Sequence, residues 1–162
     1  MTWQLRKAEP KDKEGIENLF LVMLRSVYKK EDVQRYEPGY LDKFFKDDRS
    51  WIYVAESEGN LVGYLSIEQH PDFLYLDDFC IDEKYRGLGI GTEFLKTAQK
   101  DASEKNIPQI RLHVEKSNQG AMRLYQRLGY TVAGGKDSRY LMTKIILNKN
   151  LRRIVNETKQ NQ

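Results

Sequence analysis

The glycine-rich stretch at residues 86–92, Arg-Gly-Leu-Gly-Ile-Gly-Thr, is the part of this sequence whose residue types point most directly to chemistry. A strand is expected before it, at residues 74–81, and a helix after it, whose apolar residues recur at helical spacing. Glycines between a strand and a helix let the backbone approach a ligand closely, and the unpaired N–H groups of a first helical turn favour an anion. The stretch therefore predicts a phosphate-binding loop.

The spacing of the glycines distinguishes between kinds of phosphate-binding loop. A Walker loop ends in Gly-Lys-Ser/Thr, which is absent here, and a dinucleotide fingerprint needs G-x-G-x-x-G. In this chain Gly87, Gly89 and Gly91 bring the third glycine one residue too early for that fingerprint. The sequence does match Arg/Gln-x-x-Gly-x-Gly/Ala, at Arg86, Gly89 and Gly91. The structural alternative is a strand-to-helix turn that simply needs small residues, because such turns are common in β–α–β units.

A second motif lies farther along the chain, where residues 118–130 read Asn-x-x-Ala-x-x-Leu-Tyr-x-x-x-Gly-Tyr. Together with the glycine loop, this motif resembles the GNAT superfamily of N-acetyltransferases, in which an acyl-CoA pyrophosphate loop and a segment of this kind occur in the same order. Residues 75–96 are especially similar to the polyamine-acetylating members. Residues 118–130 are equally similar to members that acetylate protein N-termini, so the branch of the superfamily stays open.

The resemblance implies an α/β fold, the GNAT fold, which is a mixed, mostly antiparallel sheet with a central parallel β–α–β crossover and splayed central strands. The sequence pattern agrees, because it predicts the order β, α, α, β, β, β, glycine loop, α, β, α, β, β through residue 147. Gly134 and Gly135 are expected to join the last two strands. We expect one domain over residues 1–147 and a polar, charged tail over residues 148–162.

The resemblance also implies acetyl-CoA as the cosubstrate and indicates where it binds. In the family, the backbone of the strand before the glycine loop pairs with the pantetheine arm, and amides of the loop hold the pyrophosphate. Asn118 would hydrogen-bond the pantetheine, or serve only as the N-cap of the helix that follows it. The cofactor-binding residues implicated are Phe79, Cys80, Ile81, Arg86, Gly87, Leu88, Gly89, Ile90, Gly91, Thr92 and Asn118.

Acetyl transfer to an amine requires proton transfers at two points. An alkyl amine has a pKa near ~10, so a neighbouring group must accept its proton at neutral pH, and a carboxylate is suited to this. Asp77 matches a glutamate that the polyamine-acetylating members use as a base through water. Asp78 is the alternative, because adjacent strand residues face opposite sides unless a bulge intervenes.

The second proton transfer is to the departing CoA thiolate, and the resemblance assigns it to Tyr125. Helical spacing alone would also explain Tyr125 as a core aromatic on the apolar face of its helix. Cys80 is expected to pack inside its strand, so transfer without an acyl-enzyme intermediate follows.

A hairpin is expected at residues 51–68, with its turn at Glu58, Gly59 and Asn60. Acidic and aromatic residues gather ahead of this first hairpin, and they are Tyr28, Glu31, Asp32, Tyr36, Glu37, Tyr40 and Asp42. They form either a solvated helix–loop–helix with a few packed rings or a wall of the substrate cleft.

Composition limits the other functions. Lys and Arg number 27 against 24 Asp and Glu, and no long basic stripe precedes the tail, so no nucleic-acid partner is expected. No apolar run is long enough to span a membrane and no signal peptide is seen, so we expect no membrane contact and a cytoplasmic location. The single cysteine, Cys80, excludes an internal disulfide and a multi-cysteine metal site, and no metal is expected.

The sequence thus predicts an acetyl-CoA-dependent N-acetyltransferase. Its acceptor is expected to be a primary amine of a small molecule, polyamine-like or amino-acid-like, or of a peptide or protein. One alternative is a non-catalytic acyl-CoA-binding or sensing module, and another is an unrelated nucleotide-binding protein, which the glycine spacing disfavours. The acceptor and the oligomeric state, a homodimer included, stay open.

Overall fold

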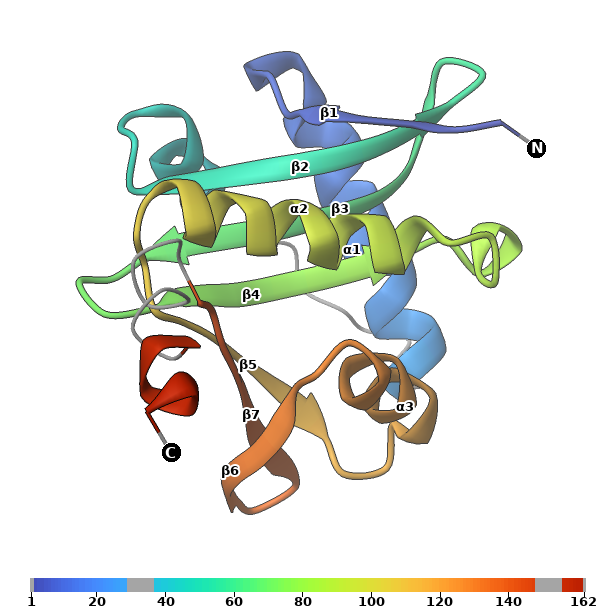
Figure 1. Cartoon of the computed structure of the whole chain (residues 1–162). Helices are drawn as coiled ribbons and strands as arrows, with labels where there is room; N and C mark the ends of the chain where they lie inside the picture. Colours follow the sequence, from blue (N-terminus) through green and yellow to red (C-terminus); the bar gives the residue numbers. More distant parts are fainter. Residues whose placement is uncertain (1, 29–36, 148–155, 162) are drawn as a thin grey trace. The chain divides into compact units, whose positions relative to one another are not determined.

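A computed structural model describes residues 2–28, 37–147 and 156–161 of the chain, with the backbone only for residues 26–28 (Figure 1). The predicted order of strands and helices is confirmed, with the short second helix being a 3-10 helix. The elements are β1 (Gln4–Lys7), η1 (Pro10–Asp12), α1 (Lys13–Tyr28), η2 (Tyr40–Phe45), β2 (Ser50–Ser57), β3 (Asn60–Gln69), β4 (Leu74–Ile81), η3 (Glu83–Tyr85), α2 (Ile90–Glu104), β5 (Gln109–Glu115), α3 (Gln119–Arg127), β6 (Thr131–Lys136) and β7 (Arg139–Ile145). Within these described ranges, no helix is both long and apolar enough to cross a membrane.

The chain divides into two units, each of which is described by itself. Unit 1 comprises Met1–Glu68 and Leu76–Phe94, and unit 2 comprises Gln69–Tyr75 and Leu95–Gln162. β4 and α2 each contribute residues to both units.

Unit 1 contains the neighbouring strands β1, β2 and β3 and the larger part of β4. β1 pairs with β2 and β2 with β3, both antiparallel. The predicted hairpin closes where Ser57 pairs with Asn60, and the turn residues Glu58 and Gly59 have φ values of 51° and 81°. Positive φ at both central residues is the requirement of a type I′ turn, whose twist matches that of the flanking strands.

The core of unit 1 joins α1 and η2 to the strands. Ile16 and Leu19 lie about one turn apart on the same face of α1, as the sequence predicts. Figure 1 shows α1 crossing β2, β3 and β4, and residues from all three strands take part in the same cluster. The buried members of the cluster are Ile16, Leu19, Leu41, Phe44, Ile52, Val54, Tyr64 and Cys80.

In unit 2, β7 lies between β5 and β6 and pairs antiparallel with both. The prediction that Gly134 and Gly135 join the last two strands is wrong, because both lie inside β6. A register shift precedes Gly134, and a Cβ on Gly135 would come within 3.1 Å of the Arg139 carbonyl oxygen. The turn falls after β6 instead, where Asp137 has a φ of 57°.

The start of β4 belongs to unit 2 and lies beside β5. Tyr75 Oη is 2.7 Å from Nδ1 of His113, a histidine for which the sequence shows no partner. β4 and β5 run parallel and are connected through α2, so the predicted β–α–β crossover in a mixed sheet is confirmed. The division into residues 1–147 and a tail stays a prediction.

Candidate active site

Unit 1 carries the whole predicted phosphate-binding loop. β4 ends at Ile81, η3 follows, and α2 begins at Ile90. Gly87 and Gly89 have φ values of +76° and +87°, and a Cβ at either position would meet no heavy atom within 4 Å. These two glycines are therefore required for their left-handed backbone conformation and not for lack of space.

The first turn of α2 presents backbone amides to this loop. The Glu93 N–H donates to the Gly89 carbonyl at 3.0 Å, which makes Gly89 the residue at which the helical hydrogen bonds begin. The N–H groups of Ile90, Gly91 and Thr92 precede that bond and have no acceptor within the helix. A helix start of this kind, with its positive dipole end, fits an anionic group such as a pyrophosphate.

Two exposed side chains flank these amides. Arg86 is exposed, and its Nε donates to the Ile81 carbonyl at 3.3 Å, which holds the guanidinium beside the end of β4. Leu88 is 40% exposed and places an apolar side chain on the surface of the loop. The loop thus combines a cation, an apolar side chain and free helix-start amides.

Neighbouring residues of β3 show which element covers each face of unit 1. Tyr64 belongs to the core cluster with α1, whereas a Cβ on Gly63 would lie 3.3 Å from the Phe94 ring. Because adjacent strand residues point to opposite faces, α1 covers one face and the first turns of α2 the other. Phe79 and Phe94 have ring centroids 5.9 Å apart, so Phe79 faces α2, and Cys80 faces α1.

Asp77 does not follow this alternation. Regular geometry would place it on the α2 face with Phe79, yet its Oδ2 accepts a hydrogen bond of 2.9 Å from Tyr40 Oη. Tyr40 begins η2 and packs against the core cluster on the α1 face. One residue farther along, the backbone N–H of Asp78 donates to the side-chain Oγ of Ser66 on β3 at 2.9 Å. This local irregularity, which spacing in the sequence left open, turns Asp77 toward η2.

The Tyr40 phenol is a hydrogen-bond donor because it stays protonated. Burial, and then the hydrogen bond to Asp77 and the charges of Asp77, Asp78 and Glu68, raise the pKa of Tyr40 well above its ordinary value. The charges of three carboxylates, two on β4 and one on β3, thus favour the protonated form of this phenol.

Cys80 is buried, and its Sγ lies 3.5 Å from the Leu19 carbonyl oxygen. Burial raises the pKa of the Cys80 thiol to about 12, so almost no thiolate forms near neutral pH. A packing role agrees with this, and a nucleophilic role does not.

In unit 2, Tyr125 lies on the buried face of α3, as its helical spacing predicts. It is 6% exposed, and its ring centroid lies 5.9 Å from that of Tyr130. Burial raises the pKa of Tyr125 well above its ordinary value, so the phenol carries its proton at neutral pH. That state suits a proton donor, but it also suits a core aromatic, and the role of acid stays a prediction.

Asn118 performs the structural function that the sequence suggests for it. Its Oδ1 accepts a hydrogen bond from the Ala121 N–H at 3.2 Å, so the side chain caps the N-terminus of α3. Its contact with pantetheine stays a prediction.

Unit 1 thus contains Asp77, the strand residues Phe79 to Ile81 and the loop from Arg86 to Thr92, whereas unit 2 contains Asn118 and Tyr125. Tyr40, which the sequence offers only as one of several residues of a possible cleft wall, and Ser66 are the residues of this site to which the sequence assigned no role of their own. Tyr40 stands among the acidic and aromatic residues ahead of the first hairpin, of which residues 31, 32 and 36 lie outside the described ranges. Ser66 carries no sequence signal, because its role depends on β4 lying beside it.

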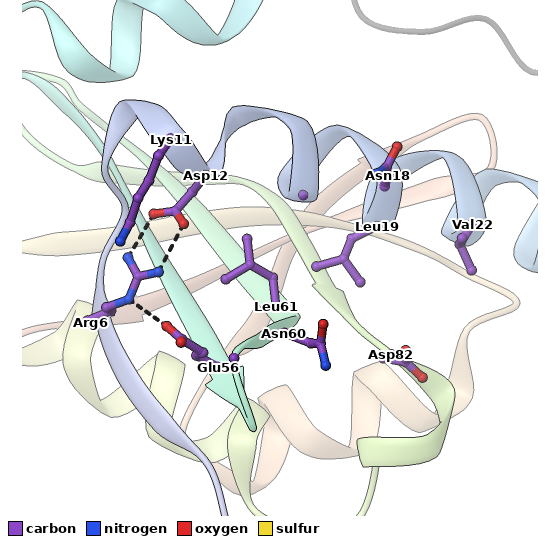
Figure 2. A pocket seen from close by; sticks show the side chains of 12 residues that line it. Arg6, Lys11, Asp12, Asn18, Leu19, Val22, Glu56, Asn60, Leu61 and Asp82 are labelled. Carbon is purple, nitrogen blue, oxygen red and sulfur yellow. Dashed lines mark hydrogen bonds and ion pairs between the residues drawn. The ribbon is translucent and has the colours of Figure 1, made fainter.

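A separate groove opens in unit 1 between α1 and the β2–β3 hairpin, with a volume of about 530 Å³ (Figure 2). Arg6 binds Asp12 through two hydrogen bonds of 2.7 and 2.9 Å and Glu56 through one of 2.9 Å. None of the predicted catalytic or cofactor-binding residues lines this groove, although Asp82 at the end of β4 does.

No group of three or more His, Cys, Asp or Glu residues in the described part of the chain is arranged to hold a metal ion. The side chains with predicted acid–base roles are Asp77, with Asp78 as its alternative, and Tyr125.

Comparison with known proteins identifies the family. The model of the acetyltransferase (GNAT) family matches residues 14–130. Among curated proteins, the chain is 35% identical over 89 residues to a spermine/spermidine N(1)-acetyltransferase of Bacillus subtilis. It is 29% identical over 110 residues to an N-alpha-acetyltransferase of Sulfurisphaera tokodaii. These matches cover 49% and 60% of this chain and 59% and 66% of the relatives, so the chain spans less than two thirds of their length.

Solved structures share the fold over nearly the whole chain. The PaiA N-acetyltransferase of Thermoplasma acidophilum, in complex with coenzyme A, matches with a TM-score of 0.75 and 18% identity, covering 90% of this chain and 99% of that one. A GNAT-family acetyltransferase of Staphylococcus aureus matches with a TM-score of 0.77 and 16% identity, with the same coverage. The predicted fold and the predicted family are confirmed, and the chain belongs to the GNAT family of acetyltransferases.

Proposed function

We propose that this chain transfers the acetyl group of acetyl-CoA directly to a primary amine. The observation that carries the proposal is the loop of unit 1, in which left-handed glycines lead into amides at the start of α2 that have no acceptor within the helix. The cosubstrate would supply an activated acetyl group as a thioester. Residues of this chain would bind it, stabilise the developing charge and transfer protons.

The loop and β4 would bind the cosubstrate. The amides of residues 90–92 and the guanidinium of Arg86 would hold the pyrophosphate, and Leu88 would cover apolar parts of the ligand. The backbone of Phe79, Cys80 and Ile81 would pair with the pantetheine arm. One of those N–H groups would stabilise the charge that develops on the acetyl oxygen, a contribution of a few kcal/mol in comparable sites.

Asp77 would accept the proton of the attacking amine, directly or through one water molecule. Its side chain is shorter than a glutamate by one methylene group, which favours transfer through water. Asp78 lies next to it, but the observation that Tyr40 holds the Asp77 carboxylate supports Asp77 for this role. Tyr125 would return a proton to the departing thiolate, and Asn118 would hydrogen-bond the pantetheine.

The acceptor is proposed to be cationic in solution. The carboxylates of Asp77, Asp78 and Glu68 all act on Tyr40, and the Lys43 ammonium that pairs with Glu68 offsets one of the three charges. The charges of Asp77 and Asp78 remain, so an ammonium ion arriving there meets a negative potential. The named activities of two relatives, on spermine/spermidine and on α-amino groups, are both activities on cationic amines. A polyamine-like or amino-acid-like molecule or a peptide amine would therefore fit, and a homodimer remains part of the proposal.

The test is release of CoA thiol when acetyl-CoA is mixed with a panel of polyamines, amino acids and peptides with free N-termini. We expect release with at least one cationic amine and none with neutral hydroxyl compounds. Tight binding of acetyl-CoA without transfer to any amine would favour the non-catalytic acyl-CoA-binding module. Preference for NAD or ATP over CoA in a binding comparison would contradict both.

A further inference from the structure

We propose that Tyr40 is a positioning residue, whose hydroxyl fixes the orientation of the Asp77 carboxylate for proton transfer. This inference rests on the proposed function, since it assumes that Asp77 serves as the base. It adds a residue from η2, a 3-10 helix that neither of the two sequence motifs includes.

The geometry of the contact is that of a strong, directed hydrogen bond. Tyr40 Oη donates to Asp77 Oδ2 at 2.9 Å across 37 positions of the chain. A carboxylate without such a contact rotates easily about its last side-chain torsion, because that torsion has no sharp minima. With Oδ2 engaged, the second oxygen, Oδ1, is the one left to accept a proton from the amine or from water.

Tyr40 is itself held from two directions. On the backbone side, Gly39 has a φ of +81° and the Tyr40 N–H donates to the Glu37 carbonyl at 2.9 Å. The neighbouring residues Leu41 and Phe44 are buried in the core cluster. The backbone of Tyr40 is thereby attached to the folded core of unit 1.

The ring is also fixed by its contacts. It meets the Phe44 ring edge-on, with centroids 6.3 Å apart. Lys43 Nζ lies 5.0 Å from the Tyr40 centroid and 2.7 Å from Glu68 Oε1, so a cation tied to β3 sits over the ring. A hydroxyl on a ring held in this way is in place before substrate arrives, which is the arrangement that lowers the cost of orientation.

The charges around the phenol agree with Tyr40 being the donor and Asp77 the acceptor of this hydrogen bond. Burial and the nearby carboxylates favour the protonated phenol, which can only then donate to an ionised Asp77. Tyr40 would act through Asp77 and not on the acetyl group, so its loss should affect the proton-transfer step without affecting cosubstrate binding.

The kinetic test compares wild type with Tyr40→Phe, Asp77→Asn and the double variant, using the amine that reacts best. We expect Tyr40→Phe to lower kcat by roughly tenfold, within the range that misplacement of a catalytic group produces, with the KM for acetyl-CoA unchanged. In the Asp77→Asn background the same substitution should have no further effect, because the group that it positions is gone. Additive losses in the double variant, or full activity of Tyr40→Phe, would overturn the proposal.

Tyr75→Phe is the matched control, since it removes a phenol hydroxyl that contacts His113 from the same strand as Asp77. We expect it to leave kcat unchanged. If Asp77→Asn alone keeps full activity, the assignment of the base fails and the positioning role fails with it, while acetyl transfer by another route stands.

A structural test does not depend on activity. In a crystal structure of Tyr40→Phe, we expect the Asp77 carboxylate to rotate or to occupy more than one orientation. An unchanged Asp77 side chain in that variant would contradict the inference, whatever the kinetics.

Discussion

The hydroxyl of Ser66, on β3, accepts a hydrogen bond of 2.9 Å from the backbone N–H of Asp78, on β4. The same Oγ lies 3.5 Å from the Asp78 carbonyl oxygen, and the Ser66 side chain is 1% exposed. A side chain of β3 therefore contacts the backbone of β4 directly after Asp77, the residue that departs from the alternation of the strand. We expect the orientation of Asp77 to depend on this contact.

Ser66→Ala should remove the hydrogen bond of the part-buried Asp78 N–H to Ser66 Oγ and lower the free energy of unfolding by about 1–3 kcal/mol. It should also lower kcat, because Asp77 would lose the backbone conformation that turns it toward Tyr40. Urea unfolding and steady-state kinetics measure the two effects.

Ser57→Ala is the matched control for Ser66→Ala. The Ser57 hydroxyl is also buried and donates to the Thr2 carbonyl at 2.6 Å, at the far end of the hairpin. Its loss should lower stability and leave kcat unchanged. Equal effects of both variants on kcat would mean that the Ser66 contact has no special role at the site.

Gly89→Ala should weaken acetyl-CoA binding through the backbone. The left-handed conformation of Gly89 costs a non-glycine residue about 1–2 kcal/mol. Because the loop is exposed, we expect the variant to relieve this strain by a local change of backbone when no ligand is bound. The strain then arises only on binding, so the dissociation constant should rise roughly 5- to 30-fold. Calorimetric titration measures this change.

Gly59→Ala is the control, because Gly59 also has a positive φ of 81° and no heavy atom within 4 Å of a built Cβ. Strain at this turn residue should lower stability and leave cosubstrate affinity unchanged. An unchanged affinity in Gly89→Ala would remove the loop from the cosubstrate site.

Asp77→Asn should reduce turnover most at neutral pH and recover part of it as the pH rises. The reason is that a free amine with a pKa near ~10 loses its proton unaided in alkaline solution. Asp78→Asn should have a smaller effect. If the pH–rate profiles of both variants follow that of the wild type, neither carboxylate takes part in proton transfer.

Tyr125→Phe should lower kcat roughly 10²-fold with little change in acetyl-CoA affinity, if its hydroxyl protonates the thiolate. The ring and its packing against Tyr130 are kept, so stability should change by only about 1 kcal/mol. Kinetics and thermal unfolding of the same preparation measure both quantities.

Tyr130→Phe is a suitable comparison for Tyr125→Phe. The Tyr130 hydroxyl is buried and, in the described part of the chain, has no hydrogen-bond partner. Its removal should leave kcat unchanged and keep or slightly raise stability. A Tyr125→Phe variant with wild-type turnover would make Tyr125 a core residue only.

The ion pair between Arg6 and Asp12 should make stability depend on pH in acid. The hydrogen bonds from Arg6 lower the pKa of Asp12 below its ordinary value of 3.8 despite the opposing effect of burial. A carboxyl group whose pKa is lower in the folded state stabilises the fold above the unfolded pKa, and this contribution is lost as the pH falls through the folded value. Asp12→Asn should therefore reduce the loss of stability between pH 5 and roughly pH 2, measured by urea unfolding. An equal acid loss in wild type and variant would contradict this assignment.

The features that the sequence determined by itself are local ones. The glycine loop, the start of α2 and the N-cap at Asn118 depend on residues within one or two turns of each other, so composition and spacing reveal them. The order of strands and helices follows from periodicity for the same reason. The motif around Tyr125 likewise places its ring on the buried face of α3.

Features that depend on segments distant in the chain become visible only in the folded structure. The contact of Tyr40 with Asp77 and that of Ser66 with Asp78 join separate elements of unit 1, and no pattern along the chain encodes either. The placement of Gly134 and Gly135 inside β6 likewise follows from pairing with β7. Position along a strand predicts the face of the sheet to which each side chain points. The hydrogen bonds to the neighbouring strand determine where this alternation of faces is interrupted.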